Sequence, residues 1–186
     1  MADLTRGELI GVLAVIPDPV EACPWMGRFA GVDFSGLDLS FLNFSQLDLS
    51  YAKFTGCCLK GANLRHALAT SADFSDADLT DACLEQSVMN QACFARSKLQ
   101  GLRASAVTCE ETDFGDADLS GAWLNGGAFV AASFRGAKLV DVRIRGAILH
   151  RCDWQSVIVQ GGEWSDIKPW AGEAPKLPFD LPAGAR

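Results

Sequence analysis

The sequence predicts an all-β solenoid, in which the chain forms a parallel β-helix around a continuous apolar core. Three observations predict this fold: a five-residue repeat that keeps its register, a 20-residue repeat superimposed on it, and the confinement of proline to the two ends. The chain has 186 residues, of which 49% are hydrophobic and 21% are charged, so it is long and apolar enough to bury such a core.

Each five-residue unit, or pentad, is described by its central residue, position i, which falls at every fifth residue from 34 to 164. These central positions hold eight Phe, eleven Leu, two Trp, two Ala and one each of Ile, Val, Met and Cys. Position i−2 also carries no charge, and Ala is its commonest residue. Both positions are therefore expected to point inward.

A longer period is superimposed on the central positions, where Phe and Leu each recur at every fourth pentad. Four pentads per coil explain this spacing, because equivalent residues of successive coils then stack at the distance between neighbouring strands. We expect about seven coils in a rod of roughly 30 to 35 Å. The two core ladders are Phe34, Phe54, Phe74, Phe94, Phe114, Phe134 and Trp154, and Leu39, Leu59, Leu79, Leu99, Leu119 and Leu139.

The boundaries of the solenoid follow from proline and from helix signals near the N-terminus. All seven prolines lie outside the pentads, where they remove no hydrogen-bond donor between coils. Thr5 and Glu8 have the spacing of a capping box, so a short helix over 6–15 is expected to cap the first coil. The predicted division is an N-terminal cap over 1–30, a solenoid over 31–166 and a Pro-rich tail over 167–186.

Three pentads carry a recognisable consensus: residues 72–76 (Ala-Asp-Phe-Ser-Asp), 77–81 (Ala-Asp-Leu-Thr-Asp) and 117–121 (Ala-Asp-Leu-Ser-Gly). They resemble the A(D/N)LXX repeat of pentapeptide-repeat proteins, and the resemblance extends over residues 32 to 166. It implies a right-handed quadrilateral β-helix without catalytic residues or cofactor. Some members of that family bind DNA gyrase, relieve its poisoning by inhibitors and dimerise end to end. This chain departs from them because no loop interrupts its pentads and prolines break its tail.

Composition excludes several classes of function. The net charge of −7 and the pI of about 4.7 disfavour direct binding to nucleic acid or to an anionic membrane. Seven cysteines without a CxxC spacing, together with only two histidines, predict neither a disulfide framework nor a metal site. This cysteine usage fits a reducing compartment, so a cytoplasmic location is expected. No apolar run reaches the ~18 to 20 residues of a membrane span.

Two adjoining faces of the expected rod are acidic. The Phe34 face comprises the outward residues of the pentads centred on 34, 54, 74 and so on, and the Leu39 face those of the pentads centred on 39, 59, 79 and so on. Their aspartates either keep a solvated rod soluble or imitate a DNA duplex to a DNA-binding enzyme. The candidate acidic strip is Asp33, Asp38, Asp73, Asp76, Asp78, Asp81, Asp113, Asp116 and Asp118.

The Leu49 face, defined in the same way from 49, carries apolar residues at positions expected to point outward. A contiguous exposed apolar patch usually marks an interface. The alternatives are that a terminal segment covers these residues or that they are β-branched packing between coils. The candidate interface, here called the apolar stripe, is Leu68, Val88, Ala128, Val130 and Ile148.

The Phe44 face, defined from 44, is a mixed surface with a basic tendency. It is interpreted either as a solvated surface or, near the last coils, as a short basic end that receives an acidic partner. Its notable residues are Arg65, Arg103, Trp123, Arg143 and Arg145, set against Glu85 and Glu163.

The sequence predicts no catalytic site. Aspartates in closely spaced pairs have no pocket on a convex rod to raise a carboxyl pKa, and Ser or Thr at i+1 are expected to hydrogen-bond locally at the corners. Cysteines at inward positions are expected to be inert and those at outward positions accessible. The inward ones are Cys57, Cys109 and Cys152, and the outward ones are Cys58, Cys83 and Cys93.

Two functions remain as hypotheses. The first is a non-enzymatic protein-interaction scaffold that docks a partner protein on the apolar stripe, with a homodimer as one arrangement. The second is a DNA mimic that binds DNA gyrase or topoisomerase IV and protects it from inhibitors. Neither requires a metal or a cofactor.

Overall fold

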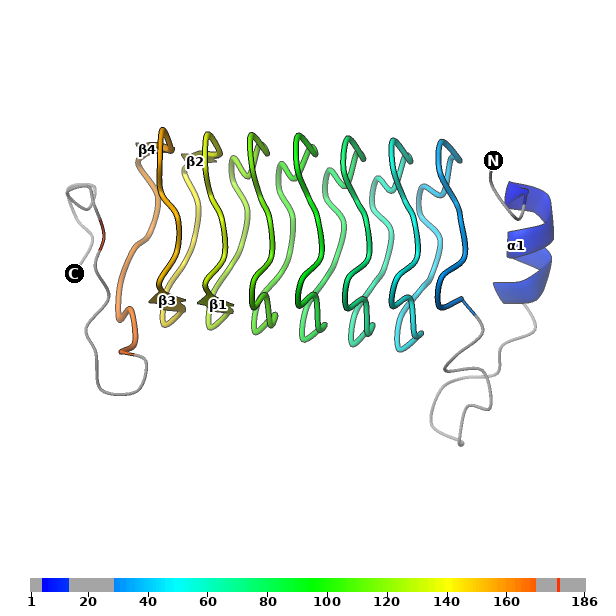
Figure 1. Ribbon diagram of the computed structural model, residues 1–186, viewed down its shortest axis with the longest axis horizontal. Helices are drawn as coiled ribbons and strands as arrows, with labels where there is room; N and C mark the ends of the chain where they lie inside the picture. Colours follow the sequence, from blue (N-terminus) through cyan, green and yellow to red (C-terminus); the bar gives the residue numbers. More distant parts are fainter. Residues whose placement is uncertain (1–4, 14–28, 170–176, 178–186) are drawn as a thin grey trace.

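The computed structural model describes residues 5–13, 29–169 and 177, which form a solenoid of stacked coils with a helix at its N-terminal end (Figure 1). The helix is α1 (Arg6–Leu13). The named strands are only three residues long, and most pairings between coils are single bridges. The named strands are β1 (Ala128–Val130), β2 (Lys138–Val140), β3 (Ile148–His150) and β4 (Ile158–Gln160).

The predicted 20-residue register is confirmed by the pairing of the coils. Parallel bridges join Asp33 to Lys53 and Lys53 to Asp73, and the same step continues along the rod. β1 pairs with β3, and β2 pairs with β4, again in parallel and with the same step between partners. Neighbouring strands of one sheet therefore belong to successive coils.

All five backbone amides of the pentad 72–76 are hydrogen-bonded. The amides of residues 73, 74 and 76 donate to carbonyls of adjacent coils at 2.9, 2.7 and 3.0 Å. The amide of Ala72 closes a turn onto the carbonyl of Ala69 at 3.2 Å. The remaining amide, that of Ser75, donates to the Asp73 side chain at 2.9 Å. Unpaired backbone polar groups are costly. A side-chain acceptor at i−1 therefore supplies the partner that the amide of residue i+1 would otherwise lack.

The core ladders stack along the axis. Successive rings from Phe54 to Trp154 lie 4.7 to 5.2 Å apart between centroids, with interplanar angles of 2 to 7°. The six leucines of the second ladder are completely buried. Polar residues at the inward position i−2 are satisfied, because the hydroxyls of Ser87, Ser97 and Thr112 donate to backbone carbonyls at 2.6 to 2.8 Å.

The corner of each pentad, position i+2, has a left-handed backbone at every step from 36 to 166. Glycine tolerates this conformation best, yet Phe41 and Tyr51 adopt it with φ of 61° and 60°. Both rings are exposed, at 79% and 66%. The Phe41 ring lies over Gly61 of the next coil, where an added Cβ would meet it at 2.7 Å.

The N-terminal helix begins with the predicted capping box. The Thr5 amide donates to Glu8 Oε2 at 2.8 Å, and the Glu8 amide donates back to Thr5 Oγ1 at 3.3 Å. The Thr5 amide and the Thr5 hydroxyl both donate to Glu8 Oε2, and these two hydrogen bonds hold the pKa of the Glu8 carboxyl below its usual value. Leu9 is buried as part of the core. The helix was expected over 6–15; residues 14 and 15 lie outside the described residues.

Candidate functional site

The aspartates at i−1 in the acidic strip act as acceptors for the backbone. Each accepts a hydrogen bond from the amide of position i+1, at 2.8 to 3.2 Å. This position explains why they are mostly half-buried, whereas the aspartates at i+2 are mostly exposed. The aspartates at i−1 are Asp33, Asp38, Asp73, Asp78, Asp113 and Asp118, and those at i+2 are Asp76, Asp81 and Asp116.

The hydroxyls at i+1 reinforce this arrangement, as predicted for the corners. Ser75 Oγ donates to Asp73 at 2.5 Å, and Thr80 Oγ1 donates to Asp78 at 2.7 Å. Burial raises the pKa of both carboxyls, but these hydrogen bonds outweigh it, so each pKa lies below its usual value. The aspartates are therefore held as anions by the fold itself.

Cations on the same two faces compensate part of the acidic strip. Arg96 donates to both carboxylate oxygens of Asp76, at 2.8 and 2.7 Å. Asp78 lies between two lysines, with Lys60 Nζ at 3.3 Å and Lys98 Nζ at 3.6 Å. Exposed pairs of this kind contribute little to stability, but they interrupt the negative charge along the strip.

The apolar stripe forms one column along the rod. Parallel bridges join Leu68 to Val88, Val88 to Thr108, Thr108 to Ala128, and Ala128 to Ile148. Leu68 is 38% exposed, and the other members, with Val130 beside them, are half-buried. Packing between coils thus accounts for part of their surface, and the apolar remainder is interrupted by Thr108 in the middle of the column. The segments expected to cover it, in the two termini, lie largely outside the described residues.

The Phe44 face carries a column of two arginines and a tryptophan. Bridges place Trp123 in register between Arg103 and Arg143. The Arg143 guanidinium carbon lies 4.5 Å from the centroid of the Trp123 ring. Elsewhere on this face, Arg65 pairs with Glu85 at 3.0 Å and Arg145 Nε pairs with Asp166 at 2.9 Å.

The inward cysteines have thiols whose pKa values are raised by burial. Burial raises the pKa of the Cys57 thiol to about 11 and that of Cys152 to about 12, and it also raises the pKa of Cys109. Thiolates at these positions are therefore scarce near neutral pH.

One expectation for the outward cysteines is wrong. Cys83 was expected to be accessible, but it is only 6% exposed. Its short side chain lies in register between the longer residues Asn63 and Arg103 of the neighbouring coils. Cys58 and Cys93 are half-buried, and burial raises the pKa of the Cys93 thiol.

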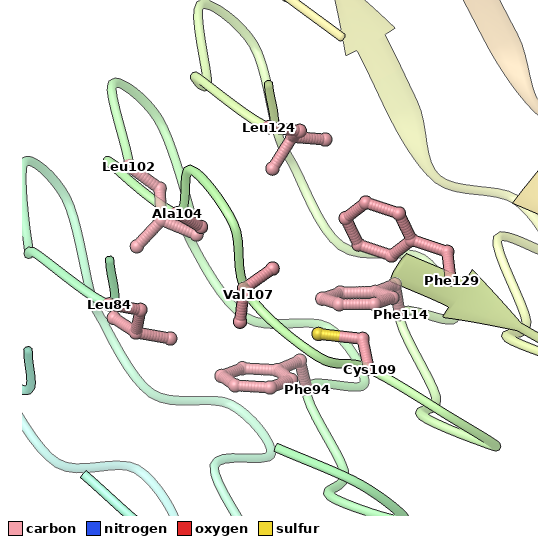
Figure 2. Close-up of a pocket in the computed structure, with 9 residues that line it drawn as sticks. All are labelled: Leu84, Phe94, Leu102, Ala104, Val107, Cys109, Phe114, Leu124 and Phe129. Atoms are coloured by element: carbon pink, nitrogen blue, oxygen red, sulfur yellow. The ribbon is translucent and has the colours of Figure 1, made fainter. Parts of the chain in front are cut away.

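A small internal cavity lies where the core ladders become irregular, beside Ala104 and Cys109 (Figure 2). At about 10 Å³ it holds at most one water molecule. Leu102 and Val107 occupy i−2 positions there and fill part of the volume that the small central residues leave. A cavity of this size and apolar lining has no capacity for a substrate. Within residues 5–13, 29–169 and 177, no group of three or more His, Cys, Asp or Glu side chains is arranged to hold a metal.

The part of the chain that the structure describes contains no helix long and apolar enough to span a bilayer. A comparison with curated protein sequences found no match. Among solved structures, the chain is similar to full-length QnrB1, a plasmid-mediated fluoroquinolone resistance protein, with 19% identity, 77% of this chain and 79% of that chain covered, and a TM-score of 0.41.

Two further solved structures are similar. One is HetL, a pentapeptide-repeat protein involved in heterocyst differentiation regulation from the cyanobacterium Nostoc sp. strain PCC 7120, with 18% identity, coverages of 84% of this chain and 94% of that chain, and a TM-score of 0.32. The other is a pentapeptide-repeat protein from the Arabidopsis thaliana thylakoid lumen, with 28% identity, coverages of 67% and 77%, and a TM-score of 0.27. These values do not assign a partner to this chain.

The family model described as Pentapeptide repeats (8 copies) matches residues 28–65, 57–96, 72–107 and 112–151. These ranges make up more than half of the chain and coincide with the stacked coils. The inward columns, the stacked ladders and the left-handed corners recur throughout them. The chain therefore belongs to the pentapeptide-repeat family.

Proposed function

We propose that this protein is a non-enzymatic interaction solenoid that docks a partner protein on the apolar stripe of its Leu49 face. The observation that supports this most is the in-register column from Leu68 to Ile148, in which every residue except Thr108 is apolar, at positions that on other faces often carry charge. A flat column on a rigid rod loses little conformational entropy when it binds. Contiguous apolar surface of this kind is typical of interfaces.

The partner we propose is a different protein and not a second copy. An antiparallel copy would place Asp48 opposite Lys168 and Leu68 opposite Ile148, because these residues lie in one column. The same arrangement would bring the exposed Glu110, which lies close to the central Thr108, against its own copy. The Glu110 contact would oppose association in this register, whereas the two Asp48–Lys168 pairs would favour it, so charge gives no reason to choose a second copy as the partner.

The test is a pair of substitutions on the stripe, Val88→Lys and Ile148→Lys, compared with Ser133→Lys at the same i−1 position of the Phe34 face. Each variant is used as bait in the extract of the source cells, and its mass in solution is measured. We expect a protein that binds wild type and S133K to be lost from the stripe variants. Equal capture by all the baits would contradict the proposal.

A second candidate function is protection of DNA gyrase or topoisomerase IV by duplex mimicry. It is supported by the acidic strip, whose aspartates recur along two adjoining faces at a fixed step. It ranks second because Arg96, Lys60 and Lys98 compensate part of that charge. A gyrase supercoiling assay with and without a quinolone is the test. Protection at micromolar protein, lost in Asp113→Asn with Asp116→Asn, would support it, and no effect would exclude it.

We also propose the finer architecture on which both functions rest. The solenoid is a right-handed, four-sided β-helix of about seven coils over 31–166, with a cap over 1–30 and a tail over 167–186, and the protein is cytoplasmic. The bridges join residues four pentads apart, which supports four sides. A crystal structure with coils of another handedness or another number of sides would contradict this description.

A further inference from the structure

We propose a second interaction surface, on the Phe44 face: the column Arg103, Trp123 and Arg143 binds an extended acidic segment of a partner protein. This surface is separate from the apolar stripe, because the two columns belong to different pentads of each coil. The inference therefore does not depend on the function proposed for the Leu49 face.

The geometry presents both a flat ring and two cations. Trp123 is 42% exposed although it is a large apolar side chain. Arg103 and Arg143 are exposed on the coils before and after it. At the strand spacing of about 4.8 Å, their Cα atoms lie roughly 10 Å apart. Tryptophan and arginine are among the residues most enriched at positions that dominate binding energies.

The two arginines of this column differ from the others on the same face in having no acidic partner. Arg65 is engaged by Glu85, and Arg145 by Asp166. Among the residues that the structure describes, neither Arg103 nor Arg143 has a carboxylate within 4.0 Å, and Arg143 instead stacks on Trp123. Glu163 lies in register beside Arg143 but is not within ion-pair distance of it, so both guanidiniums can take a carboxylate from outside in a bidentate manner.

An acidic protein segment fits this column better than a nucleic acid. Arg143 covers one face of Trp123, which leaves one face for a single base or aromatic side chain and no room for the successive stacking of several bases. The adjoining Leu39 face carries Asp38, Asp78 and Asp118, and the chain has a net charge of −7, so a long polyanion would be repelled beyond the column. A short peptide can place two carboxylates and one aromatic side chain on the column and nothing on the neighbouring face.

The experiment measures binding of the fluorescein-labelled peptide Glu-Glu-Phe-Glu-Glu by polarisation in 20 mM NaCl. The control peptide is Gln-Gln-Phe-Gln-Gln, and a labelled 15-nucleotide oligo-dT is the nucleic-acid probe. We expect R103Q/R143Q to weaken binding of the acidic peptide at least tenfold and W123A at least threefold. The charge-matched variant R65Q/R145Q should retain it within twofold, because those arginines are already paired.

Three results would overturn the proposal: no binding of the acidic peptide at 1 mM, equal losses in R103Q/R143Q and R65Q/R145Q, or tighter binding of the oligo-dT than of the peptide. The substituted side chains are exposed, so melting temperatures should match wild type. If a variant melts at a lower temperature than wild type, its binding result is replaced by an NMR titration of the wild-type protein. In that titration the indole N–H signal of Trp123 must shift when the acidic peptide is added. The variant V88K/I148K should bind the peptide as wild type does.

Discussion

The Phe34 face and the Leu49 face are built on the same backbone but use position i−1 in opposite ways. On the Phe34 face, Asp33, Asp73 and Asp113 each accept the amide of residue i+1. On the Leu49 face, Asp48 does the same in the first coil, but Leu68 and Val88 have no side-chain acceptor. The core behind them differs as well, because a uniform Phe ladder stands behind the first face and a mixed ladder behind the second.

This difference separates residues that the fold needs from residues that it does not. A backbone hydrogen bond contributes about 1 kcal/mol net, so an aspartate at i−1 is favoured by folding alone, whatever partner the face meets. Its abundance on the Phe34 face is therefore weak support for duplex mimicry. An apolar residue at i−1 forgoes that hydrogen bond and exposes apolar surface, which makes the Leu49 face the stronger indication of function.

The largest effect expected is on the uniform ladder. Phe74→Ala removes a completely buried ring that stacks on Phe54 and Phe94 at 4.8 and 4.9 Å, and it should lower the free energy of unfolding by about 3 to 5 kcal/mol. Cys109→Ala, in the mixed ladder beside the cavity, should cost about 1 kcal/mol. Urea unfolding measures both. Similar losses at the two sites would remove the contrast between the ladders.

A smaller effect is expected from the acceptor at i−1. Asp73→Ala removes hydrogen bonds from the Ser75 amide, the Ser75 hydroxyl and Thr55 Oγ1, and it should destabilise the fold by about 1 to 3 kcal/mol. Asp73→Asn keeps an acceptor for the amide and should recover part of that loss. Asp76→Asn, which removes an exposed ion pair with Arg96 and keeps a residue type that tolerates the left-handed corner, is the control and should cost less. A loss at Asp76 as large as that at Asp73 would contradict the structural role of i−1.

The same carboxylates predict destabilisation by acid. Burial raises the pKa values of Asp73, Asp78 and Asp118, but hydrogen bonds outweigh it, so these pKa values lie below the usual value of 3.8. A lowered pKa in the folded state stabilises the fold above the unfolded pKa, and that contribution is lost as pH falls through the lowered pKa. Urea midpoints should thus be steady near neutral pH and fall below about pH 4. If the urea midpoint of Asp73→Ala falls less in acid than that of wild type, the acid destabilisation comes from these carboxylates. An equal fall in both proteins would contradict this assignment.

Much of this architecture was predictable because it repeats. The 20-residue register, the stacking of Phe74 on Phe94 and the capping box at Thr5 and Glu8 all follow from periodicity or from a local motif. The expected hydrogen bonds of Ser and Thr at the corners were also found, with aspartate as their partner.

The features that escaped prediction depend on neighbours in space. Cys83 is buried although its position in the pentad points outward, and its neighbours on the preceding and following coils are the larger Asn63 and Arg103. The cavity beside Ala104 arises from the summed volumes of side chains on several coils. The arginines that pair with a carboxylate do so with a side chain of another coil, so the pentad of an arginine alone does not predict its partner. The repeat predicts the position of each residue in the coil, but it does not predict how side chains of neighbouring coils pack against one another.

The last comparison exchanges the two uses of i−1. Val88→Asp gives the Leu49 face the acceptor that the Phe34 face already has, so the gain of a hydrogen bond to the Asn90 amide should offset the lost apolar contact with Leu68. We expect the free energy of unfolding to change by less than about 1 kcal/mol, while capture of the stripe's partner is lost. Val88→Asn, which brings the acceptor without the charge, separates the two contributions. If Val88→Asp instead destabilises the protein by more than about 2 kcal/mol, Val88 serves packing between coils, and the Leu49 face loses its distinction from the acidic ones.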